Sequence, residues 1–192
     1  MNTNWAEDNL SLIRTLMERA SIYRRALAPI MIAAGVIGTT AAVAGLSLRL
    51  DAPSQFLACW IGAAVVALLS AFALARREAI RLREAFWSPP ARRVGLALLP
   101  VAVAGVIAAF VESDPARLAG WWLLIYGVGL HGAGFFMPGG VRRLSWFFVA
   151  AGGVALGWGA CSPHVIMGLG FGGLHLAYGI YLYTTRSRPI SL

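Results

Sequence analysis

The chain lacks lysine altogether and has few acidic residues. All sixteen of its basic residues are arginine, against eight Asp and Glu in 192 positions. Without lysine, a Schiff base of the retinal or pyridoxal type is excluded. The sequence also contains no Gly-Lys-Ser/Thr phosphate loop and no His-Glu-x-x-His zinc helix. Two cysteines and three histidines are then the main side chains left for metal or redox chemistry.

Apolar residues are abundant instead. They make up 59% of the chain, charged residues only 12%, and the mean hydropathy is +0.72. A soluble protein of this composition would have too little polar surface to cover its core. Six apolar runs are long enough to cross a bilayer: 26–48, 55–75, 94–111, 121–138, 145–163 and 165–185. Because lipid offers no partner to the backbone, the fold class predicted is all-α, a bundle of six transmembrane helices in one membrane domain, residues 1–192.

The arginines predict the orientation of this bundle. Fourteen of the sixteen fall on one side of the predicted spans, and only Arg49 and Arg117 fall on the other. The positive-inside rule then places both termini in the cytoplasm. The net charge of +8 is explained by this topology and by contact with anionic headgroups, so the bilayer is the expected partner and nucleic acid is not.

Two further helices are predicted on the cytoplasmic side. Residues 9–25 carry apolar side chains at helical spacing, which predicts an N-terminal amphipathic helix lying in the interface. Residues 75–87 are rich in arginine and predict a second helix, in which Glu78 can pair with Arg81. The segment Ser88-Pro89-Pro90 is expected to end it.

Two histidines lie inside predicted spans, where an ionisable side chain is costly and usually has a role. His131 and His175 are each about ten residues, or roughly 15 Å, from the outer end of their span, which places both near the midplane. Tyr126 and Tyr178 share these spans and complete a candidate intramembrane polar site. Tyr178, three residues after His175, is the expected hydrogen-bond partner of that histidine.

Glycines accompany both histidines on the same helix faces. They are Gly127 and Gly134 beside His131, and Gly168, Gly172 and Gly179 beside His175. Such stripes let helix backbones approach closely, so each histidine is expected to face a neighbouring helix rather than lipid.

Three functions follow from the two histidines. If each is neutral and bonds across a helix interface, the protein is a structural, regulatory or accessory subunit without catalysis of its own, packed against a second copy or another membrane protein. If a path passes His175, the protein is a small transporter or channel. If His131 and His175 meet, they could ligate haem b or a metal ion, or relay a proton. The first reading predicts no cofactor and no catalytic residue.

A weaker constellation lies near the outer surface, where Cys59 begins one span, Cys161 ends another and His164 follows. If this surface faces an oxidising compartment, a disulfide between Cys59 and Cys161 can form. Two unlinked cysteines are the ordinary alternative.

Several short motifs resemble a family of small uncharacterised bacterial inner-membrane proteins. They are Ile13-Arg14-Thr15-Leu16-Met17-Glu18-Arg19 near the start, Arg92-Arg93, Tyr126-Gly127, and Gly170-Phe171-Gly172-Gly173-Leu174-His175. The resemblance implies a multi-pass protein of the bacterial inner (cytoplasmic) membrane and no particular activity. It extends to His175, whereas the family pattern has an apolar or amide residue around the position of His131.

Overall fold

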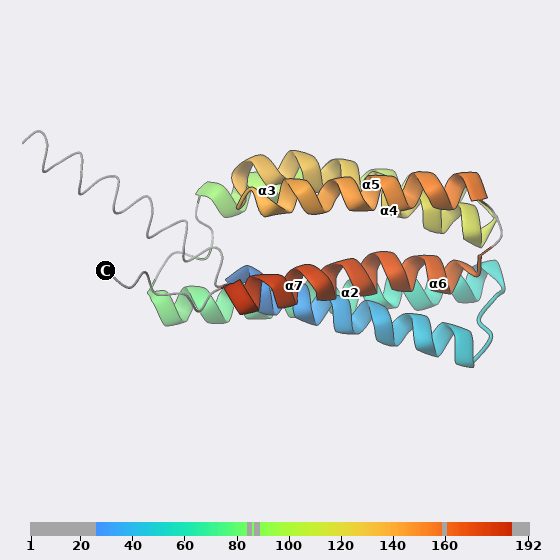
Figure 1. The fold of residues 1–192 in the computed structure, drawn as a ribbon, viewed down its shortest axis with the longest axis horizontal. Coiled ribbons are helices and arrows are strands. Elements are labelled where there is room, and N and C mark those ends of the chain that lie inside the picture. The colour runs from blue at the N-terminus through green and yellow to red at the C-terminus, as the bar shows by residue number, and fades with distance from the viewer. Residues whose placement is uncertain (1–25, 84–85, 87–88, 159–160, 186–192) are drawn as a thin grey trace, which may run out of the picture.

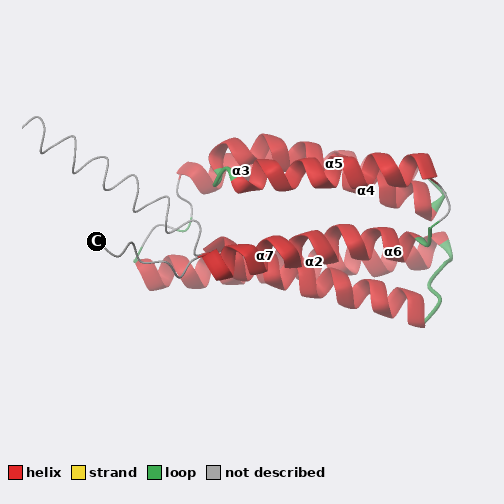
Figure 2. Ribbon diagram, viewed as in Figure 1, coloured by secondary structure: helices red, strands yellow, loops and turns green. Residues whose placement is uncertain are grey.

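The structure, a computed structural model, describes residues 26–83, 86, 89–158 and 161–185. This part of the chain is helical and contains no strand (Figure 2). The first helix is Ala26–Ser47, which is unlabelled in Figure 1 and is called helix 26–47 here. It is followed by α2 Pro53–Leu82, α3 Pro89–Val111, α4 Pro115–Ala133 with the 3-10 turn η1 Gly134–Phe136, and α5 Gly140–Trp158. The last described elements are α6 Pro163–Met167, the π-helical η2 Gly168–Leu174 and α7 His175–Thr184. The last three run end to end as one rod.

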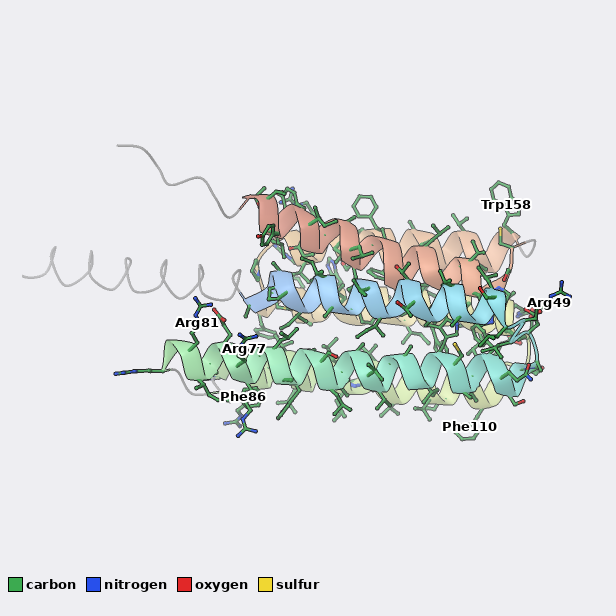
Figure 3. All side chains as sticks on the ribbon, turned by 90° about the horizontal axis from the view of Figure 1, so that it is seen from below. Arg49, Arg77, Arg81, Phe86, Phe110 and Trp158 are labelled. Atoms are coloured by element: carbon green, nitrogen blue, oxygen red, sulfur yellow. The ribbon has the colours of Figure 1, made fainter. Side chains whose placement is uncertain are left out.

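The helices form two layers of three (Figures 1 and 3). One layer contains α3, α4 and α5, with α4 in the middle. The other contains α2, helix 26–47 and the α6–η2–α7 rod, with helix 26–47 in the middle. One buried cluster, which includes Leu123, Phe148 and Leu182, lies between the layers. A second cluster around Phe56 and Trp60 fills the end near the 48–52 connection.

Five of these helices are long and apolar enough to span a membrane: helix 26–47, α2, α3, α4 with η1, and the α6–η2–α7 rod. The all-helical, membrane-compatible architecture is therefore confirmed. Helix α5 is not among the five, because Arg142 and Arg143 in its first turn reduce the hydropathy of its 19 residues. The sixth span remains a prediction.

Proline begins four of the helices, which corrects several predicted boundaries. Pro53, Pro89, Pro115 and Pro163 are the first residues of α2, α3, α4 and α6. Proline suits this position because the first N–H groups of a helix have no intrahelical partner. The helices consequently start up to six residues before the apolar runs at 55, 94, 121 and 165. Pro89-Pro90 begins α3 instead of ending the helix before it.

Two other predicted elements differ from the structure. The separate helix at 75–87 is wrong, because α2 continues unbroken to Leu82 and ends where Arg83 turns left-handed, with φ 54°. The fifth span was expected at 145–163, but α5 covers Gly140–Trp158 and takes Arg142 and Arg143 into its first turn. The expected ion pair between Arg81 and Glu78 is present at 4.0 Å. The predicted interfacial helix at 9–25 lies outside the described residues.

Glycine brings the rod close to helix 26–47. A Cβ atom on Gly172 would lie 2.6 Å from Thr39 Oγ1 and 2.9 Å from Thr39 N. On Gly179 it would lie 2.8 Å from Ile32 N, and on Gly168 2.6 Å from Ala42 Cβ. Since backbone atoms are among these neighbours, no rotation of a side chain could make room. The two helices can lie at this distance only because these positions lack a side chain.

Helices α4 and α5 approach each other in the same way. A Cβ on Gly127 would lie 2.8 Å from Val149 N, and one on Gly134 2.6 Å from Arg142 Cγ. In return, a Cβ on Gly152 would lie 2.6 Å from Leu124 N. The five glycines predicted from the sequence to pack helices thus all contact a neighbouring helix of the same chain.

Replacement of Gly172 by alanine is expected to lower the free energy of unfolding by about 1–3 kcal/mol, because the new methyl group overpacks a backbone contact. Gly95→Ala is the matched control, since a Cβ at Gly95 meets no atom within 4 Å. Equilibrium unfolding of the purified variants in detergent measures both. Equal stability of the two variants would contradict the packing described here.

Candidate functional site

His175 lies at the centre of a hydrogen-bonded site between the two layers. It is the first residue of α7, at the middle of the rod, and only 4% of its surface is exposed. Its Nε2 atom is 2.9 Å from the hydroxyl of Tyr126 on α4. Its Nδ1 atom is 2.9 Å from the backbone oxygen of Phe171, one turn earlier in η2. Both ring nitrogens therefore have a partner.

These partners determine which nitrogen of the neutral ring carries the proton. A backbone carbonyl can only accept a hydrogen bond, so Nδ1 of His175 must carry the proton that it donates to Phe171 O. In a neutral imidazole Nε2 is then an acceptor, and the Tyr126 hydroxyl donates to it. The bond joins residues 49 positions apart and links one layer to the other. This is the geometry of a neutral histidine that joins two helices.

Two phenylalanine rings enclose this hydrogen-bonded pair. The ring centroids of Tyr126 and Phe148 are 4.9 Å apart, those of Phe148 and His175 5.1 Å, and those of Tyr126 and Phe171 5.0 Å. The ring of Phe171 stacks on His175 at 6.1 Å. Four elements, α4, α5, η2 and α7, each contribute one ring. The enclosure keeps the polar pair away from lipid, where an unpaired polar group is costly.

The π-helical η2 leads directly into this site. A π-helix pairs each N–H with the carbonyl five residues earlier and occurs most often as a short insertion at functional sites. Four of the seven η2 residues are glycine, which leaves the wider turn free of side chains. The other three residues are Leu169, Phe171 and Leu174, and the ring and the carbonyl of Phe171 both contact His175.

His131 lies elsewhere, and it is farther from the start of its helix than the sequence predicted. Helix α4 begins at Pro115, so His131 is in its last turn, about 24 Å along the helix from its start. Its Nδ1 is 3.0 Å from Ser145 Oγ on α5, and that hydroxyl donates to Arg142 O at 2.7 Å. His131 therefore donates to Ser145. In the described part of the chain it shares no hydrogen-bond partner with His175.

The third histidine makes a connection that the sequence did not reveal. His164 was expected in an outer connection, but it is the second residue of α6 and is fully buried. The indole N–H of Trp60 donates to its Nδ1 at 3.1 Å, and Nε2 lies 3.0 Å from Leu50 O. Nε2 must then carry the proton. Pro163 could have indicated this position in the sequence. A proline often marks the first residue of a helix, so His164 would lie inside the helix and not in the connection before it.

Two other predicted partnerships are not formed. The hydroxyl of Tyr178 lies beside Gly140 at the start of α5, and Tyr126 takes the place at His175 predicted for it. Both cysteines are free: the Cys59 thiol lies 3.7 Å from Ala41 O, and Cys161 is exposed. The disulfide considered from the sequence is absent from the structure.

An apolar groove of about 390 Å³ runs between α5 and the rod, lined by residues that include Ala151, Val154, Trp158, Leu169 and Leu174. His175 is not among its lining residues.

Within residues 26–83, 86, 89–158 and 161–185, no three His, Cys, Asp or Glu side chains are grouped so that they could hold a metal ion. The polar groups of the site are thus engaged with one another.

Comparison with known proteins identifies no relative: no protein-family model, curated protein or solved structure matches the chain. The resemblance to small bacterial inner-membrane proteins stays a prediction.

Tyr126→Phe is expected to lower the free energy of unfolding by about 1–2 kcal/mol, because His175 Nε2 loses its donor inside the bundle. The same change at exposed Tyr183 is the control and should have little effect. A double-mutant cycle with His175→Leu, followed by unfolding in mixed micelles, measures the coupling between the two side chains. A coupling of zero would show that the bond does not contribute to stability.

Proposed function

We propose that this protein is a non-catalytic accessory subunit of the bacterial inner membrane, which binds a transmembrane helix of another subunit through the outward face of α5. Such a protein needs a rigid bundle, no reactive centre and a lipid-facing surface suited to close helix contact. Two observations on the described residues support the proposal: the histidines bond between helices, and α5 presents two exposed glycines.

The engagement of the histidines supports a structural role. His131 joins α4 to α5, His175 joins α7 to α4, and His164 joins α6 to α2 and to Leu50. A transporter or redox centre at His175 would first have to break a hydrogen bond that links the two layers. Neutral histidines that bond across helix interfaces stabilise a membrane bundle without any ligand.

Helix α5 carries the observation on which the proposal rests. Gly153 and Gly157 form a Gly-x-x-x-Gly pair, are both exposed, and a Cβ atom added to either would meet no other atom within 4 Å. The other glycines of this helix contact α4 or α7: Gly152 lies against Leu124 and Gly140 against Tyr178. A small-residue pair of this spacing allows a second membrane helix to approach closely. On α5 that place is open.

The proposal includes six spans with both termini in the cytoplasm. Helix α5 lies alongside α4 and connects the two ends of the bundle, which supports a sixth crossing (Figure 1). Arg77 and Arg81 lie at one end of the bundle and Arg49 at the opposite end (Figure 3), in agreement with the arginine bias of the sequence.

Gly153→Leu with Gly157→Leu is expected to reduce the apparent mass of the complex extracted in mild detergent to that of the single chain, because two leucines block close helix contact. Gly62→Leu is the control, since Gly62 also lies in open space but on α2. Native gel electrophoresis compares the three proteins. A wild-type chain that already migrates alone, or a double variant that keeps its complex, would overturn the proposal.

A reporter fused after Thr185 is expected to behave as cytoplasmic, with fluorescence from green fluorescent protein and no activity from alkaline phosphatase. A phosphatase inserted at Ser113, between α3 and α4, should be active. The opposite pattern would invert the proposed orientation, and active phosphatase at both sites would remove one of the six spans.

A further inference from the structure

Two arginines are held over the phenylalanine rings of η1. The guanidinium carbon of Arg142, on α5, lies 5.0 Å from the ring centroid of Phe135. That of Arg93, on α3, lies 5.8 Å from the ring centroid of Phe136. Both distances are within the range of a cation–π interaction, which orders a side chain that would otherwise be free to move in solvent. Three elements therefore present two positioned cations at one end of the bundle.

No described carboxylate neutralises these cations. Among the described acids, Glu78 pairs with Arg81 on α2, and Glu112 pairs with Arg117 at the opposite end of α3. Asp51 and Asp114 belong to the connections that precede α2 and α4, also at that opposite end. The patch of Arg92, Arg93, Arg142 and Arg143 is exposed and has no ion pair in the described part of the chain.

The helix dipoles add to the positive potential. Helices α3 and α5 both begin at this end, and neither has an acidic residue in its first turn. The N-terminus of a helix carries a partial positive charge and favours anions. Here each N-terminus is followed by an arginine pair, which adds repulsion. An anion placed between them would offset both the side-chain charge and the two dipoles.

We propose that this patch is a binding site for the phosphate of an anionic phospholipid, with Arg93 and Arg142 as its principal ligands. Its surroundings favour a lipid over a soluble anion. Phe135 is 65% exposed and Phe136 42%, so apolar rings lie beside the cations at the end of a membrane-compatible helix. Guanidinium groups suit the phosphate, whereas the rings suit the acyl chains and the glycerol region of the same molecule.

The test is a titration of the purified full-length protein with phosphatidylglycerol, and with phosphatidylcholine of the same chain length, followed by native mass spectrometry. The wild-type protein should bind phosphatidylglycerol more tightly. Arg93→Gln with Arg142→Gln should weaken that binding by about 25-fold, or about fivefold for each arginine. The matched control is Arg76→Gln with Arg77→Gln, which removes the same charge from exposed positions at the same end of the bundle and should bind nearly as wild type.

A second variant keeps the charges and removes the rings. Phe135→Leu with Phe136→Leu should weaken phosphatidylglycerol binding by less than the arginine variant does, because the guanidinium groups remain but are no longer held in place. This variant also tests the proposal if the arginine variant fails to fold. An equal loss of phosphatidylglycerol binding in the Arg76/Arg77 control would show that the lipid is held only by general charge attraction, and would overturn the proposal. Displacement of the lipid by millimolar inorganic phosphate, or no preference over phosphatidylcholine, would overturn it as well.

Discussion

The close approach of helix backbones at glycine is the constraint on which this structure depends. Gly172 lies against Thr39 and Gly179 against Ile32, so the α6–η2–α7 rod has one position along helix 26–47. Gly127 and Gly152 place α4 against α5 in the same way. The distance between Tyr126 and His175 follows from these contacts, because each side chain belongs to a helix whose place is set by glycine. The polar site is therefore a product of the packing.

The three histidines show how an apolar bundle accommodates ionisable groups. Each ring has a partner on another helix, and each set of partners can be satisfied by a neutral imidazole. His164 accepts from the indole of Trp60, His175 accepts from the hydroxyl of Tyr126, and His131 donates to Ser145. Hydrogen bonds between membrane helices have modest individual energies, about 0.6 kcal/mol on average. Their effect here comes from position, since the three lie at different heights and connect different pairs of helices.

The sequence predicted the helices well and the polar contacts poorly. Long apolar runs can only be helices in lipid, so the all-α architecture followed from composition and length. The starts of α3 and α4 were missed because the apolar runs begin later than Pro89 and Pro115, and that error in α4 also misplaced His131. The bond between Tyr126 and His175 joins residues 49 positions apart, and no local spacing encodes it. Tyr178 was the natural choice on an ideal helix, but its hydroxyl lies near Gly140.

The length of α2 has a mechanical consequence. Its 30 residues make a rod of about 45 Å, whereas the hydrocarbon core of a bilayer is about 30 Å thick. Almost none of its spanning segment is buried inside the protein, so few contacts with other helices hold this rod in place. A helix that is longer than its bilayer tilts as the bilayer thins. Because α2 is unbroken as far as Leu82, such a tilt would displace Arg77 and Arg81 near its end. A change in bilayer thickness would therefore move these two charges parallel to the membrane.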